Sequence, residues 1–91
     1  MLHEVNDMHE IFPREVTSNV PRITLTGAEL LHVEQHQGLM GCTREEVSLR
    51  TACGVLTVHG GNLTLRQYSA VEAVVSGDIT GISMQHEGRL R

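Results

Sequence analysis

The stretch GVLTVHGGNLTLRQ, residues 54–67, decides the fold class of this chain. Apolar and polar side chains alternate on both sides of a central Gly60-Gly61-Asn62. Alternation with a period of two is typical of a strand with one buried face. Glycine and asparagine accept the positive φ that a tight hairpin loop requires. The stretch therefore predicts two strands joined by a hairpin loop at Gly60-Gly61-Asn62.

The same alternation extends through most of the chain. Short runs, bounded by glycine or charged residues, lie around residues 22–26, 31–34, 38–41, 46–51, 55–59, 63–66, 71–76 and 79–84. Short strands at close and even spacing are typical of a sandwich or barrel. We therefore expect an all-β domain, a small and mostly antiparallel β-sandwich or barrel of about seven to eight short strands. A β-solenoid is the second choice, because the glycines show no fixed period.

Local signals divide the chain further. We expect turns at Gly27-Ala28, Thr43-Arg44-Glu45 and Gly77-Asp78, and at most one turn of helix within residues 68–75. The β domain is expected to span residues 21–86. Residues 1–20 are expected to form a poorly structured tail because prolines interrupt them, and residues 87–91 a C-terminal tail.

Composition limits the classes of partner. The 91 residues carry a formal net charge of −4. Every basic side chain other than histidine is arginine, and no basic run occurs. This argues against a nucleic-acid-binding surface and against a polybasic membrane patch. No apolar stretch approaches the roughly 20 residues that span a bilayer, and the first residues lack a basic signal-peptide region. We expect a cytoplasmic protein without direct membrane insertion.

The polar residues predict no catalytic residue, cofactor or metal site. His32 and His36 lie four positions apart, which on a strand separates them by about 13 Å, too far to share one ion. Cys53 and His59 would lie at opposite ends of one strand, which excludes a nucleophile–base pair. A metal- or ligand-binding module built on His32, His36 and Cys42 remains an alternative. The two cysteines are too few for a disulfide framework and are expected to be small buried apolar residues.

Several segments carry a resemblance to a known family. They are PRITLTG at residues 21–27, VEQHQGL at 33–39, EVSLRT at 46–51 leading into GVLTVHG at 54–60, and SGDI at 76–79. In this order the chain resembles the YabP/YqfC family of sporulation proteins, and the YqfC branch most closely. The resemblance implies a non-enzymatic protein of the mother cell, linked to spore cortex or coat formation. It also implies association with a membrane-bound stage IV sporulation protein at the outer forespore membrane, and it brings no catalytic residue or cofactor.

Sheet edges are the expected means of binding a protein partner, because their unpaired backbone groups accept another strand. The expected edges are the entry strand, Ile23–Thr26, and the closing strand, Ile79–Met84. The partner-binding residues predicted from these positions and from the tail are Phe12, Ile23, Leu25, Ile79, Ile82 and Met84. A further alternative is a self-assembling β-polymer subunit, or a homo-oligomer formed through the same edges.

Overall fold

The computed structural model describes residues 20–86, in which all regular structure is β-strand. The strands are β1 (Arg22–Thr26), β2 (Leu30–Glu34), β3 (His36–Cys42), β4 (Glu46–Thr51), β5 (Gly54–Tyr68) and β6 (Glu72–Gln85). The all-β prediction is confirmed. Within the described range there is no helix, and so none that could cross a membrane. Both predicted tails lie outside these residues, apart from the last position of the N-terminal one.

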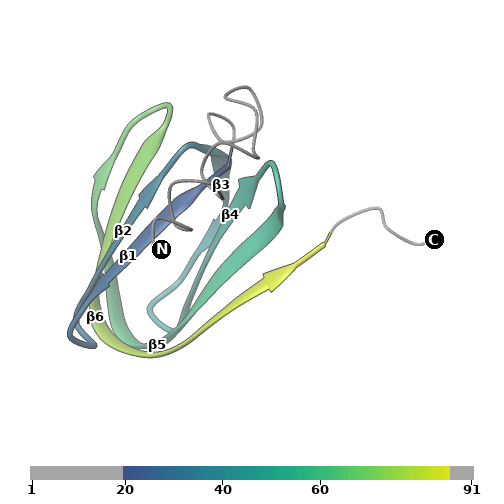
Figure 1. Cartoon of the computed structure of the whole chain (residues 1–91). Coiled ribbons are helices and arrows are strands. Elements are labelled where there is room, and N and C mark those ends of the chain that lie inside the picture. Colours follow the sequence, from purple (N-terminus) through teal and green to yellow (C-terminus); the bar gives the residue numbers. More distant parts are fainter. Residues whose placement is uncertain (1–19, 87–91) are drawn as a thin grey trace, which may run out of the picture.

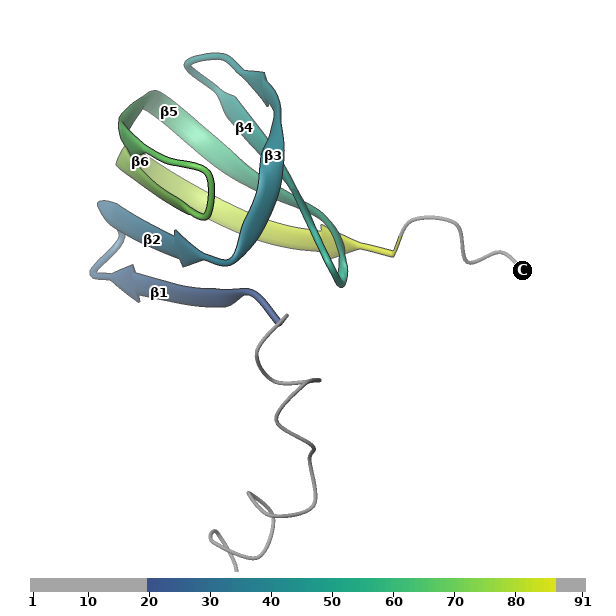
Figure 2. The ribbon, with the colours of Figure 1, turned by 90° about the horizontal axis from the view of Figure 1, so that it is seen from above.

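The six strands form one antiparallel sheet in the order β1-β2-β6-β5-β4-β3. Strands β5 and β6 are long and bend near their middles, so that the two halves of the sheet face each other (Figures 1 and 2). One half contains β1, β2 and the adjoining parts of β5 and β6. The other half contains β3, β4 and the remaining parts of the long strands. The sheet is not closed between β1 and β3, and its antiparallel pairing differs from that of a solenoid.

Two predicted turns are in fact bends within continuous strands, which reduces the strand count to six. The hairpin predicted at Gly60-Gly61-Asn62 is wrong, since β5 runs through it, and so is the turn at Gly77-Asp78 within β6. The pairing register shifts at His59/Gly60 and between Gly61 and Thr64. Such irregularities increase the local bend of a strand.

Each bend is held by the backbone of a turn from another part of the chain. At the β5 bend, Gly60 N donates to Glu45 O (3.0 Å) and Leu63 N donates to Arg44 O (2.8 Å). At the β6 bend, the equivalent bonds come from the β1–β2 turn: Gly77 N donates to Glu29 O (3.1 Å) and Ile79 N to Ala28 O (2.9 Å). The carbonyl groups of the two short turns therefore satisfy the donors that the bends expose.

The predicted turns at Gly27-Ala28 and Thr43-Arg44-Glu45 are confirmed. Gly27 has a φ of 60°. Thr43 Oγ1 accepts from Glu45 N (3.2 Å) and Glu46 N (3.0 Å), which closes the second turn locally. The turn between β5 and β6 contains no helix; Ser69 Oγ accepts from Glu72 N (3.0 Å) across it.

The core lies between the two halves of the sheet and is built from the inward residues of four strands. Its buried apolar residues are Leu31, Val33, Val47, Leu49, Leu56, Val58, Leu63, Ala73, Val75 and Ile79. Burying each larger side chain contributes about 1.5–3 kcal/mol. Ile23, Leu65 and Met84 pack against this cluster from its margin.

Candidate interaction surfaces

The predicted partner-binding residues differ widely in exposure. Leu25 and Ile82 are 45% and 37% exposed. Ile23 and Met84 are partly buried against the core. The side chain of Ile79 is only 7% exposed, so a partner does not reach it as a surface group. Phe12 lies outside the described residues. Partner binding by these residues stays a prediction, with Leu25 and Ile82 as its accessible members.

The sheet ends at β1 on one side and at β3 on the other. The expectation that the entry strand is an edge is confirmed. The predicted closing strand, Ile79–Met84, belongs to β6, which lies between β2 and β5 in the sheet order, so it is not a terminal strand. Residues 81–85 of β6, however, pair only with β5 in the described structure. Sequence reasoning missed the β3 edge, although the glycines at 38 and 41 were a signal of an irregular strand.

The two terminal edges are built differently. Strand β1 pairs with β2 in an unbroken register over all five residues, from Arg22↔Glu34 to Thr26↔Leu30. The register between β3 and β4 shifts twice, and Gly38 has a φ of 141°. Bulges twist an edge away from regular pairing. The β1 edge is therefore the better template for another strand.

The corner between β2 and β3 is organised around a buried histidine. His36 is 3% exposed, its Nε2 donates to Ser69 O (2.9 Å), and its Nδ1 accepts from Gly38 N (2.9 Å). The ring stacks on Tyr68 with 5.0 Å between centroids, and Tyr68 Oη accepts from Leu39 N (3.0 Å). His36 thus ties β3 to the turn between β5 and β6. Sequence reasoning did not predict that His36 is buried, because Ser69 and Tyr68, which cover it, are more than thirty positions away in the sequence.

The metal-binding alternative is not supported by the placement of its residues. Both ring nitrogens of His36 are occupied within the protein. The His32 ring lies at the surface beside Glu72 (3.3 Å) and Glu34 (3.9 Å). Within residues 20–86, no group of three or more histidine, cysteine, aspartate or glutamate side chains is arranged to hold a metal ion.

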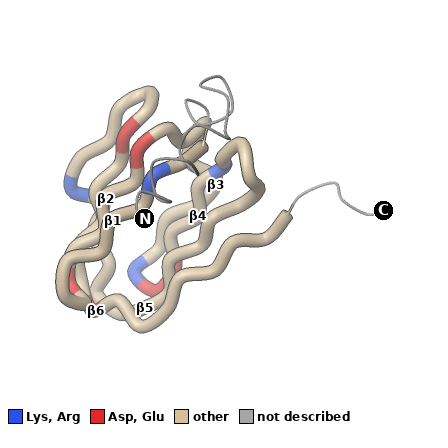
Figure 3. The backbone as a smooth tube through the Cα atoms, in the orientation of Figure 1, with Lys and Arg blue, Asp and Glu red and all other residues tan. Residues whose placement is uncertain are grey.

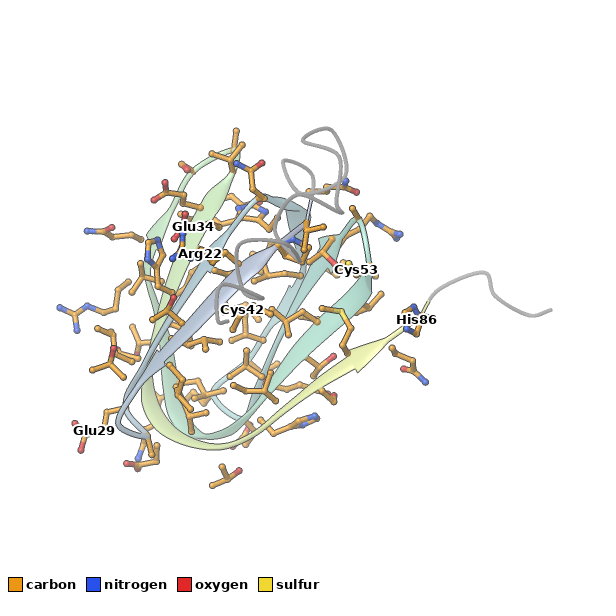
Figure 4. The ribbon with its side chains drawn as sticks, in the orientation of Figure 1. Arg22, Glu29, Glu34, Cys42, Cys53 and His86 are labelled. Atoms are coloured by element: carbon orange, nitrogen blue, oxygen red, sulfur yellow. The ribbon has the colours of Figure 1, made fainter. Side chains whose placement is uncertain are left out.

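Cys42 and Cys53 are free and lie apart (Figure 4). Cys42 is opposite Val47 at one end of β4, whereas Cys53 belongs to the turn that follows Thr51 at the other end. Cys42 is exposed, so the expectation that both cysteines are buried is wrong for this residue, and Cys53 is only partly buried. Its strand lies at the edge of the sheet, where no further strand covers it.

The described surface has neither a cluster of like charges nor a pocket lined by reactive side chains. Arginine and acidic positions are interspersed over the described chain, and the arginines stand apart from one another (Figure 3). A shallow hollow of about 390 Å³ is lined by Leu30, Arg66, Gln67 and Val74. These four side chains offer neither a nucleophile nor a carboxylate.

Comparison with known proteins shows the family. A profile of the YabP family matches residues 17–91. The chain belongs to the YabP family. It is also 30% identical over 67 residues to the uncharacterized protein YqfC of Bacillus subtilis (strain 168), a match that covers 74% of this chain and 72% of that protein. No solved structure matches.

The YabP-family match includes all six strands, both bends and the His36 corner. The resemblance inferred from the sequence is therefore confirmed. The segment VEQHQGL, which carried part of it, forms the end of β2, the corner and the start of β3. In this YabP-family chain the segment has an architectural role, because Gln35 has a φ of 67° and His36 bonds across the corner.

Proposed function

We propose that this chain is a non-enzymatic sporulation protein that acts as a small β-sheet adaptor in the mother cell during spore envelope formation. Its partner is a membrane-bound stage IV sporulation protein at the outer forespore membrane. The observation that carries the proposal is membership of the YabP family over residues 17–91, which suggests a sporulation-related protein. Within spore envelope formation, we propose that the protein acts in the formation of the cortex and coat.

The free edges of the sheet support an adaptor role. Residues 81–85 of β6 keep one side unpaired in the described structure, and Ile82 lies there with 37% of its surface exposed. Ile82 is opposite the core residue Val58, so its side chain belongs to the inner face of the sheet. A strand from a partner would bond to this edge and cover Ile82.

The arrangement of polar groups supports a non-enzymatic role. Among residues 20–86 one histidine is strongly buried, His36, and both of its ring nitrogens bond to backbone groups. His59 lies at the surface beside Ser83 (3.4 Å) and Glu46 (3.9 Å). These contacts hold strands together at the surface and do not form an enclosed reaction site.

Affinity capture from sporulating cells tests the proposal. We expect the full-length tagged chain to recover a mother-cell membrane protein, and Ile82→Lys to lose that protein because a charge would be buried at the contact. Gln85→Lys, an exposed change on the same strand, is the matched control and should retain the partner. Circular dichroism establishes that both variants are folded.

Two results would contradict this function. Recovery of no membrane protein above the level of an untagged strain would remove the adaptor role. Unchanged sporulation and cortex structure in cells lacking the chain would remove the link to spore envelope formation.

A further inference from the structure

We infer that β1 pairs with the β1 of a second copy of this chain, antiparallel and about a two-fold axis at Thr24, so that two sheets join into one. This inference concerns self-association and does not depend on the proposed role in sporulation. In this arrangement β1 binds a second copy of the chain, whereas the β6 edge binds a strand of the proposed partner protein.

The backbone of β1 is suited to pairing with another strand. Residues Arg22–Thr26 contain no proline, glycine or lysine, and their register with β2 is regular. Natural edge strands usually avoid association by such residues, by bulges or by a covering element. Strand β3 has register shifts and a positive φ at Gly38, and the free part of β6 begins at Gly81.

A two-fold axis at Thr24 makes the strand complementary to itself. Ile23 of each copy then lies opposite the partner's Leu25, Thr24 lies opposite the partner's Thr24, and Arg22 lies opposite the partner's Thr26. All five residues find a partner, and the apolar pairs fall on the inner face, since Ile23 and Leu25 are opposite Val33 and Leu31 of β2. Leu25, which is 45% exposed in the single chain, becomes covered.

Other registers are poorer. A slip by one residue would turn the apolar side chains of one copy to the outer face of the other. Moving the axis to Ile23 would leave Leu25 opposite the partner's Pro21, which has no N–H to donate. Moving it to Leu25 would leave Ile23 opposite the partner's Gly27, which offers no side chain to pack.

The charges at the two ends of β1 agree with the antiparallel pairing. Arg22 lies at one end of the strand, and Glu29 lies in the turn beyond the other end (Figure 4). The two-fold axis brings Arg22 of each copy to the end at which the other copy carries Glu29. The two Arg22 side chains are four positions out of register, about 13 Å along the strand, so they do not repel at close range.

A two-fold contact uses the β1 edge of both copies and therefore ends in a dimer. It leaves no free β1 for a third copy, which separates this arrangement from an open polymer. A five-residue strand provides a small interface, below the roughly 1,200 Å² that is typical of stable complexes. We therefore expect a weak dimer that forms with increasing concentration.

Disulfide trapping tests the register directly, because a disulfide forms only between thiols that lie close together. It also suits a weak dimer, since the covalent bond captures short-lived contacts. In the full-length chain with Cys42→Ser and Cys53→Ser, Thr24→Cys places two thiols opposite each other across the axis. The matched control is Thr26→Cys, on the same exposed face of β1 but far from its own copy. We expect mild oxidation to give about tenfold more crosslinked dimer with Thr24→Cys than with Thr26→Cys.

A second cysteine control separates the two regular edges. Ser83→Cys lies at the centre of the free part of β6, which would also be complementary to itself. Crosslinking through Ser83→Cys in place of Thr24→Cys would overturn the inference, as would equal crosslinking at Thr24→Cys and Thr26→Cys.

Sedimentation velocity gives an independent measurement without cysteine changes. The unmodified chain should sediment faster as its concentration rises, and Leu25→Lys should abolish this shift. Leu39→Lys is the matched control, since Leu39 is 38% exposed on the other terminal edge and should leave the shift unchanged. If the unmodified chain stayed monomeric at every concentration, the proposed dimer would be contradicted.

Discussion

Gly27 and Gly60 occupy similar local sequences, but the backbone follows a different path at the two positions. Each follows an alternating run and begins a short stretch that favours a turn. At Gly27 the chain reverses between β1 and β2, whereas at Gly60 it bends and continues as β5. The difference lies in what each glycine contacts.

An added Cβ at Gly27 would meet nothing within 4 Å, so this glycine is required only for its φ of 60°. A Cβ at Gly60 would overlap the carbonyl oxygen of Asp78 in the neighbouring strand β6. At Gly77, a Cβ would lie 2.6 Å from the carbonyl oxygen of Asn62 in β5. The β5 bend therefore requires glycine because two backbones approach closely, whereas the turn at Gly27 requires it because of its own torsion angle. Gly77 at the β6 bend combines both requirements, since its φ is 139° and its backbone lies close to β5.

The largest expected effect is at the β5 bend. Gly60→Ala should lower the free energy of unfolding by about 3 kcal/mol or more, because backbone atoms of β6 have to move away from the new methyl group. Urea denaturation followed by circular dichroism measures the change. Gly61→Ala is the matched control: a Cβ there meets nothing within 4 Å, and we expect a change within about 0.5 kcal/mol. Equal effects of the two substitutions would contradict the close-approach explanation.

The His36 corner extends the comparison to a place where a side chain, rather than a glycine, directs the backbone. His36→Phe keeps a ring beside Tyr68 but leaves Ser69 O and Gly38 N without their partner, so we expect a loss of about 1–3 kcal/mol in unfolding free energy. His32→Phe, at the surface of β2, should change stability by less than about 0.5 kcal/mol. Thermal unfolding of both variants decides whether the corner depends on these two bonds.

The smallest expected effect is at the β1–β2 turn. Gly27→Ala should cost about 1 kcal/mol, since an alanine at positive φ is strained but has space. Gly27→Asn should cost less, because asparagine adopts this conformation more readily. A loss at Gly27→Ala as large as that at Gly60→Ala would show that local torsion alone governs both sites.

The candidate surfaces were partly predictable from the sequence. Leu25 and Ile82 were chosen for their places in the first and last strands, and both are exposed. Ile79 was chosen for the same reason but is buried, because it lies on the same inward face of β6 as Ala73 and Val75. The β3 edge was not predicted, since strand order depends on which distant segments pair.

The period of two determined, from the sequence by itself, that the chain is all-β and which side chains form its core. Val47, Leu49, Leu56 and Val58 alternate with polar neighbours and are fully buried, because successive side chains of a strand point to opposite faces. The reversal at Gly27 was also predicted from the sequence, but only the tertiary structure decided that the chain bends and continues as a strand at Gly60 and Gly77, where turns were expected. Local torsion preferences permit either outcome at a glycine, and contacts between backbones far apart in the sequence select one of them.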